Sequence, residues 1–212
     1  MEVITFTVNP IQEHTYIIYD ETKECAIIDC GCLTDREKSA VKNFIAENGL
    51  QPKHLLNTHL HFDHALGNRF IFDTYGLKPE ANQADEFLLA QMKTQLDVFL
   101  GKELSEEPAP IGKYLNEGDK VVFGNSELEV LHVPGHSPGS LVFYARKDNM
   151  LFAGDVLFRE SIGRTDLPGG NYATLINGIK NKLLTLPDET LVFCGHDETT
   201  TIGHERKYNP YL

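Results

Sequence analysis

The feature that most constrains this chain is residues 58–64, which read Thr-His-Leu-His-Phe-Asp-His directly after a short apolar run. Such a run is typical of a buried strand, so the polar cluster is expected where that strand ends. Alternate side chains of an extended segment share a face, which places His59 and His61 side by side. A helix expected to begin near Asp63 turns Asp63 and His64 toward a neighbouring point. Because imidazole and carboxylate groups are ligands of divalent transition metals, the stretch predicts a metal site rather than a histidine-rich surface loop.

Three later segments end in side chains of the same kind. His136 lies in a turn framed by proline and glycine, while Asp155 and His196 each follow a short apolar run. Each signal is weak alone, because a turn histidine is usually a surface residue and a strand-end aspartate is usually a helix cap. Their repeated position at the ends of buried strands predicts that they meet at one edge of a sheet.

The apolar periodicity divides the chain into two strand-rich runs, each with helices. Strands are expected at residues 2–8, 15–19, 25–29, 54–57, 120–123, 127–133, 140–145, 150–153 and 191–194. Helices are expected from a capping box at 34–37 to Gly49, from about 63 to Gly76, over 82–100 and over 172–184, with a mobile connector at 102–112. The pattern predicts an α/β protein with two facing sheets and outer helices, in one domain spanning residues 1–212.

The expected helix over 82–100 carries an apolar stripe that should pack on the body of the protein. The stripe consists of Phe87, Leu88, Met92, Leu96 and Phe99. The connector that follows is expected to be a surface loop, with a lid over the site as the alternative.

Charge and cysteine content limit the partners and the compartment. The formal net charge of -12 disfavours a nucleic-acid or anionic-membrane surface, and no apolar run reaches the length of a membrane span. The N-terminal residues lack the basic region and long apolar stretch of a signal peptide. The cysteines show no Cys-x-x-Cys spacing, so reduced thiols are favoured over a ligand pair at Cys30 and Cys32. A cytoplasmic protein without nucleic-acid or membrane partners is therefore expected, and its oligomeric state is left open.

Seven of these residues together resemble the binuclear ligand set of the metallo-β-lactamase superfamily. They are His59, His61, Asp63, His64, His136, Asp155 and His196. Within that superfamily the chain is most similar to the glyoxalase II-like hydrolases of the short, single-domain bacterial branch. The stretches that carry this closer resemblance are residues 15–17, 134–140, 154–158, 161–170 and 209–211. The resemblance implies a four-layer αβ/βα sandwich of two mixed sheets with outer helices, and metals at one edge of the paired sheets.

Carried over residue by residue, the resemblance also implies a role for each ligand. It implies a first metal on His59, His61 and His136, a second on Asp63, His64 and His196, and a bridge by Asp155. Zinc is expected for the two divalent ions, with iron or manganese as alternatives, because His and Asp ligands accept all three.

Two such cations, about 3.5–4 Å apart, can share a water and supply hydroxide near neutral pH. A metal-bridging hydroxide, oriented by Asp63, would attack an acyl carbonyl. A thiolate leaving group, with a reference pKa of about 8.5, needs little protonation, so a small-molecule thioester of the hydroxyacylglutathione type is the expected substrate.

The chain departs from the longer glyoxalase II enzymes at two places. It ends 16 residues after His196, without their C-terminal helical domain, and it reads Gly-Arg-Thr-Asp at 163–166 near the place of their Lys-x-Tyr clamp. Recognition of glutathione is therefore left open. Arg159 and Arg164 are candidates for binding a substrate carboxylate, with a structural ion pair as the alternative. Tyr172 is a further substrate-binding candidate, with packing as the alternative.

Several rival functions share the expected fold or the metal site. Persulfide dioxygenases have a similar Gly-Arg-Thr-Asp stretch and use one iron on fewer positions, among them those that match His59, His61, His136 and Asp155. A lactamase is disfavoured by the missing signal peptide and by Asp155, where those enzymes usually carry cysteine. The acidic charge disfavours a nuclease, and a non-catalytic metal-binding module would not need two complete sites.

Overall fold

The first half of the chain forms a mixed sheet. The computed structural model describes residues 1–104 and 106–212. The strands of this sheet lie in the order β1 (Glu2–Val8), β2 (Glu13–Tyr19), β3 (Glu24–Ile28), β4 (Gln51–Leu56), β5 (Pro79–Ala81) and β6 (Lys113–Tyr114). Strands β1 to β3 pair antiparallel and β3 to β6 pair parallel. Parallel neighbours need crossover connections, and these are supplied by α1 (Asp35–Glu47), α2 (Phe62–Ala65), α3 (Asn68–Tyr75) and α4 (Glu86–Leu100).

The second half forms another mixed sheet, in the order β14-β13-β10-β9-β8-β7. Its strands are β7 (Lys120–Phe123), β8 (Ser126–His132), β9 (Leu141–Ala145), β10 (Met150–Gly154), β13 (Leu191–Cys194) and β14 (Thr200–Thr201). Strands β10 and β13 pair in parallel, with α5 (Tyr172–Gly178) in their connection, so their carboxyl ends lie at the same edge. A short hairpin, β11 (Leu157–Phe158) and β12 (Ser161–Ile162), follows β10.

The period-two alternation of the strands sorts their side chains between two apolar layers. In β2, Tyr16 and Ile18 belong to the core between the sheets, where Phe143 of the second sheet also lies. The neighbouring Ile17 and Tyr19 belong to the layer under α1 and α3 instead. Both faces of the strand are therefore buried, which explains its continuous apolar run.

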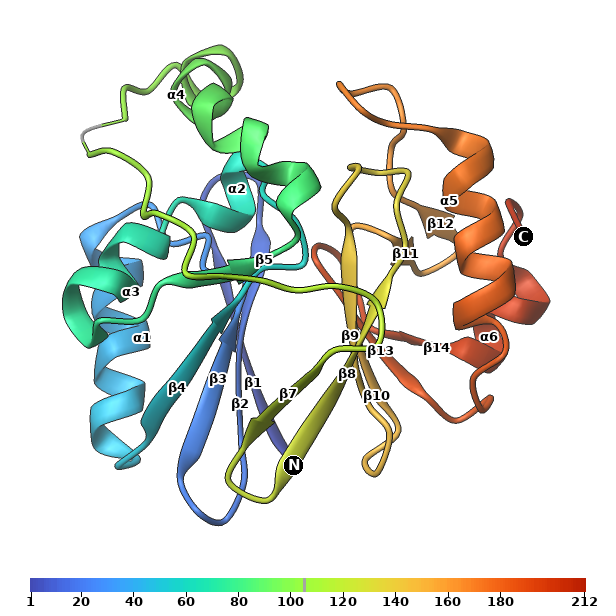
Figure 1. The fold of residues 1–212 in the computed structure, drawn as a ribbon, viewed down its shortest axis with the longest axis horizontal. Helices are drawn as coiled ribbons and strands as arrows, with labels where there is room; N and C mark the ends of the chain where they lie inside the picture. The colour runs from blue at the N-terminus through green and yellow to red at the C-terminus, as the bar shows by residue number, and fades with distance from the viewer. Residues whose placement is uncertain (105) are drawn as a thin grey trace.

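Helices cover the outer faces of both sheets (Figure 1). Val41 of α1 and Ile71 of α3 pack on the first sheet, and Leu175 of α5 and Ile202 of α6 (Ile202–Tyr208) pack on the second. The capping box predicted for α1 is present, because Thr34 and Glu37 satisfy each other's backbone N–H groups. These four layers confirm the predicted fold class. In the described part of the chain, no helix has both the length and the apolar character to cross a membrane.

Several local predictions differ from the structure. The short elements β5, β6, β11, β12, β14 and α6 were not predicted, because segments of two to seven residues carry little periodic signal. The apolar stripe of α4 is only partly buried, since Phe87 and Phe99 are exposed. The predicted helix over 172–184 is α5 followed by one π-helical turn at Ile179–Leu183. Residue 105 of the predicted connector lies outside the described residues.

A testable prediction concerns Asp20, a buried carboxylate that joins the β2–β3 turn to the β7–β8 turn. It accepts hydrogen bonds from Thr22 in its own turn and from Asn125 and Ser126 in the other. Burial alone would raise the pKa of Asp20, but these hydrogen bonds lower it to about 2. Asp20→Ala is expected to lower the free energy of unfolding by about 2 kcal/mol at pH 7, measured by urea titration.

The pH dependence of this effect has a definite sign. A carboxylate whose pKa is lower in the folded state stabilises that state at pH values above its pKa in the unfolded chain, about 3.9. This stabilisation is lost as the pH falls toward the pKa of the folded state. The difference between the wild type and Asp20→Ala should therefore be constant from pH 7 to pH 5 and shrink below about pH 4. The control Glu21→Gln, on the exposed side of the same turn, should change stability little; an equal loss there would contradict the assignment.

Candidate metal centre

The seven predicted ligands lie together at the ends of four strands. His59 and His61 follow β4, Asp63 and His64 lie in α2, His136 lies in the turn between β8 and β9, and Asp155 and His196 follow β10 and β13. Backbone hydrogen bonds lock these segments together, among them Leu141 N to the carbonyl of Thr58 and Gly195 N to the carbonyl of Gly154. The convergence therefore follows from strand ends of both sheets meeting at one edge.

The first cluster consists of three buried imidazoles. His136 Nε2 lies 3.2 Å from His59 Nε2 and 2.9 Å from His61 Nδ1. The ring centroids are 4.6–4.8 Å apart and the rings are nearly perpendicular. Three nitrogen atoms thus face one common point, which is the arrangement of a three-histidine cation site.

The second cluster combines Asp63, His64 and His196. Their potential ligand atoms lie within 4.8 Å of one another, and Asp63 Oδ2 is 3.3 Å from His196 Nε2. Asp155 contacts both clusters: its Oδ1 is 3.3 Å from His64 Nε2, and its Oδ2 is 3.5 Å from His136 Nε2. Asp155 is therefore placed between the two groups of nitrogen atoms, where a bridging ligand would lie.

Acceptors behind the imidazoles fix their tautomers. The Nδ1–H groups of His136 and His196 donate to the backbone carbonyls of Arg164 and Ile11, at 2.8 and 3.2 Å. The Nδ1–H of His64 donates to Asp29 Oδ2 at 3.1 Å. In each ring the proton is thereby held on Nδ1, so that the Nε2 lone pair points into the site.

His59 is oriented in the same way through a hydroxyl group. Thr58 Oγ1 donates its proton to Asp29 Oδ2 at 2.6 Å, so it accepts from the Nδ1–H of His59 at 3.0 Å. One carboxylate, Asp29, thus orients two predicted ligands. This pattern of a carboxylate or carbonyl behind a histidine is the one that supports metal-bound imidazoles in proteins.

The donor set fits a bound cation. Because His59 and His136 both keep their protons on Nδ1, two Nε2 lone pairs face each other at 3.2 Å. His61 Nε2, His64 Nε2 and Asp155 Oδ1 are buried without a hydrogen-bond partner among the described residues. Buried polar atoms are normally paired. Cations at the two clusters would satisfy the facing lone pairs of His59 and His136, together with His64 Nε2 and Asp155 Oδ1.

The protonation states agree with this fit. Burial, together with the neighbouring His64, His61 and His136, lowers the pKa of His59 well below its ordinary value. Burial and His136 lower the pKa of His61 to about 4. Burial alone would raise the pKa of Asp155, but the facing imidazoles of His64, His136 and His196 hold it well below its ordinary value. At neutral pH His59 and His61 are therefore neutral and Asp155 is ionised, which are the metal-binding forms. Burial alone would lower the pKa of His64 and His196, but the facing carboxylates of Asp63 and Asp155 raise it, so these two rings would release a proton on binding a metal.

A cavity of about 220 Å³ lies directly over the clusters. Its floor is made of His61, Asp63, His136, Asp155 and His196, and its walls are made of Ile11, Phe62, Gln95, Phe99, Arg164 and Leu167. Of the three residues predicted to bind substrate, Arg164 lines this cavity. Arg159 pairs with Glu198 at 2.9 Å and Tyr172 is exposed, and neither lines the cavity. Their roles stay predictions.

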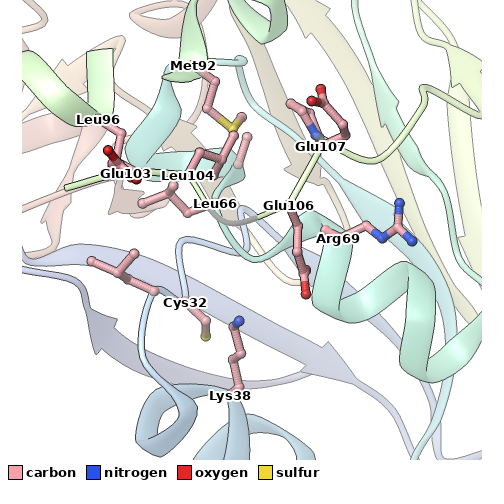
Figure 2. Close-up of a pocket in the computed structure, with 13 residues that line it drawn as sticks. Cys32, Lys38, Leu66, Arg69, Met92, Leu96, Glu103, Leu104, Glu106 and Glu107 are labelled. Atoms are coloured by element: carbon pink, nitrogen blue, oxygen red, sulfur yellow. The ribbon is translucent and has the colours of Figure 1, made fainter. Parts of the chain in front are cut away.

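A second, smaller cavity of about 50 Å³ lies beside the first helices (Figure 2). Cys32 and Lys38 line it from the region of α1, Met92 and Leu96 line it from α4, and the described part of the connector closes it with Glu103 and its neighbours. None of the seven ligands lines this cavity. The described connector residues thus cover a different cavity from the one over the two clusters of predicted ligands, which we call the metal cavity. This position does not favour the alternative that the connector is a lid over the predicted metal site.

Three groups of site residues were missed by the sequence interpretation. Asp29 ends an apolar strand just as Asp155 does, so the same strand-end signal would have found it. Asp85 is buried and accepts from Leu60 N, Ser137 Oγ and Gly139 N, which ties the His59–His61 segment to the His136 turn. The cavity residues Phe62, Gln95 and Phe99 have no local signal, because they read as ordinary helix residues.

Asp29 provides a second testable prediction. Asp29→Asn is expected to lower metal affinity by about 10–100-fold, measured by competition with a chelating dye. Asparagine tolerates the positive φ of 50° at this position, but its amide group keeps one accepting oxygen of the two that Asp29 uses for Thr58 N–H, the Thr58 hydroxyl and His64. The control Asp35→Asn, in the exposed first turn of α1, should leave the affinity unchanged. Wild-type affinity in Asp29→Asn would show that Asp29 does not orient the ligands.

Comparison with known proteins agrees with this geometry. The profile of the metallo-beta-lactamase superfamily matches residues 8–196, which include all seven predicted ligands. The hydroxyacylglutathione hydrolase GloC of Haemophilus influenzae (strain ATCC 51907 / DSM 11121 / KW20 / Rd) is 36% identical over 217 residues, covering 100% of this chain and 98% of the relative.

Two solved structures are similar along their whole length. The BLEG-1 B3 metallo-beta-lactamase superposes with a TM-score of 0.89 at 35% identity, covering 100% of this chain and 99% of the other. TTHA1623 in a di-iron-bound form superposes with a TM-score of 0.87 at 35% identity, covering 99% and 100%. The names of these similar proteins thus describe a hydroxyacylglutathione hydrolase, a metallo-beta-lactamase and a protein in a di-iron-bound form.

Proposed function

Because the chain belongs to the metallo-beta-lactamase superfamily, we propose that it is a hydrolase that uses two divalent metal ions to cleave a small thioester of the hydroxyacylglutathione type. His59, His61 and His136 would hold one ion, Asp63, His64 and His196 the other, and Asp155 would bridge them. Zinc is the proposed metal, with iron or manganese as alternatives; the di-iron form of TTHA1623 keeps iron among them.

The observation that carries this proposal is the position of Asp155. Its two oxygen atoms lie 3.3 and 3.5 Å from nitrogen atoms of different clusters, His64 and His136. A protein that held one metal would not need a second group of candidate ligands that share this carboxylate. The name of the GloC relative supports a thioester as the substrate.

Two bound cations would supply hydroxide from water near neutral pH and polarise the acyl carbonyl. Asp63 lines the cavity with its carboxylate held by His196, so it would orient the attacking water by accepting its hydrogen bond. The reaction forms a C–O bond and breaks the C–S bond. Water's hydrogens end on the carboxylic acid and the thiol, and the weakly basic thiolate leaves without a dedicated acid.

A persulfide dioxygenase is the second candidate, and one observation favours it. The Gly-Arg-Thr-Asp stretch at 163–166 resembles the one in those enzymes, and here Arg164 lines the cavity while pairing with Asp166. The convergence of Asp63, His64 and His196 argues against it, because a single iron leaves these residues without a role.

A substrate panel on the purified, metal-loaded protein would separate the candidates. An acyl-glutathione thioester should be hydrolysed, detected by release of free thiol. Glutathione persulfide should cause no oxygen uptake, and a β-lactam should be a poor substrate. Oxygen uptake with persulfide, or turnover of the lactam without turnover of any thioester, would overturn the proposal.

A further inference from the structure

The wall of the metal cavity contains an aromatic pair supplied by two helices. Phe62 of α2 and Phe99 of α4 stack with ring centroids 5.6 Å apart and an interplanar angle of 12°. Phe62 is buried, whereas Phe99 keeps 50% of its surface exposed although it lines the cavity. Ile11 and Leu167 add apolar surface to the same cavity. An apolar group that entered here would bury the exposed part of Phe99, which is favourable.

The polar groups of the wall do not offer a free positive charge. Arg164 is the one cationic side chain among the described residues of the wall. Its guanidinium pairs with Asp166 through two hydrogen bonds, Nε to Oδ1 and Nη2 to Oδ2, each 2.8 Å long. A glutathionyl arm, which carries two carboxylates and one ammonium group, would therefore find the cationic side chain of the wall already engaged.

Gln95 is the remaining polar residue of the wall. It lies on α4, one turn before Phe99, and its Oε1 atom is buried without a hydrogen-bond partner among the described residues. A buried amide oxygen without a donor is costly, and a ligand that donates an N–H or O–H would remove the cost. The wall thus combines an aromatic face with one uncharged polar contact.

We propose that Phe62, Phe99 and Gln95 form an aromatic subsite that binds an uncharged, apolar substituent of the thioester, with a neighbouring N–H or O–H group facing Gln95. This inference rests on the proposed thioester hydrolysis and names the substrate class. The substituent belongs either to the acyl group or to the thiol. Where it belongs to the thiol, an acyl-glutathione thioester is still hydrolysed, but with a lower kcat/KM than the thioester of an aromatic thiol.

Two pairs of substrates test the subsite on the metal-loaded protein. The acyl pair is acetyl and phenylacetyl N-acetylcysteamine; the thiol pair is the acetyl thioesters of glutathione and phenylmethanethiol. The aromatic member of at least one pair should have a kcat/KM higher by about 10-fold. Phe99→Ala should abolish this preference, and Gln95→Ala should raise the KM of the N-acetylcysteamine thioesters. Val98→Ala, at a neighbouring position that is 71% exposed and outside the cavity, should retain the preference.

A gain of function provides a further check. Asp166→Asn removes the charge that engages Arg164, so it should lower the KM of the glutathione thioester several-fold. Equal kcat/KM values within both pairs, or a preference that survives Phe99→Ala, would overturn the subsite.

A binding measurement distinguishes failure of the subsite from failure of the proposed hydrolysis. The ligand is a thioether analogue in which CH2 replaces the acyl carbonyl, and its binding to the protein is measured by calorimetry. Binding of the phenyl analogue that depends on Phe99, without turnover of any thioester, would support the subsite and overturn the proposed reaction. Absence of such binding would overturn the subsite.

Discussion

Replacing Asp155 with alanine is expected to remove at least one of two bound metal ions and to lower kcat/KM for a thioester by about 1,000-fold. The physical reason is its position between the clusters, with Oδ2 at 3.5 Å from His136 Nε2 and 3.8 Å from His196 Nε2. Without the carboxylate, two cations would repel each other across the gap with no negative charge between them. Metal analysis by mass spectrometry and thiol release measure the two effects.

Two further variants test whether the charge of Asp155, and not its side-chain volume, retains the metal ions. Asp155→Asn keeps the side-chain volume but loses the charge, and it should show most of the loss. Asp166→Ala removes an exposed carboxylate outside the clusters, and it should keep both metal ions. If Asp155→Ala retained two metal ions per chain and full activity, a bridging role for Asp155 would be excluded.

Removal of the metal ions with a chelator is expected to abolish thioester turnover and to lower the melting temperature by roughly 8–16 °C. Ligand at about 1,000 times its Kd stabilises the folded state by about 4 kcal/mol, and each kcal/mol shifts the Tm of a chain of this size by about 2–4 °C. The fall has a structural cause, because the lone pairs of His59 and His136 then face each other without a cation. Calorimetry with and without chelator measures the shift.

Repletion identifies the preferred metal. Zinc, iron(II) and manganese(II) are added separately to the chelated protein, and the ion that restores both the Tm and the turnover is the functional one. In Asp155→Ala the chelator should shift the Tm much less, because less metal is bound. An unchanged Tm and full turnover after complete metal removal, verified by elemental analysis, would rule out a metal-dependent hydrolase.

Much of the architecture was predictable because regular elements leave a periodic signal. The continuous apolar run of β2 and the capping box of α1 are local features that a buried strand or a helix of any fold would show. The elements that escaped prediction, such as β14 with two residues, are too short for a period to be read. In α4 the period was clear, but it could not show that Phe99 faces a cavity instead of the core.

The candidate ligands were predictable for a different reason. Metal-binding side chains are chemically distinctive, and the spacing of His59, His61, Asp63 and His64 within one short stretch is unusual enough to be seen without a structure. The later residues His136, Asp155 and His196 became persuasive as a set through their shared position after apolar runs. Their individual metal-binding roles stay predictions until metal is measured.

By itself, then, the sequence determined the order of strands and helices and the chemical identity of the donors, because both are written in residue type and local spacing. Only the tertiary structure decided which groups support those donors. Asp29 reaches His64 across 35 residues, and Asp85 reaches Gly139 across 54. Such contacts depend on how two sheets pack, and packing joins residues whose separation in the chain carries no periodic signal.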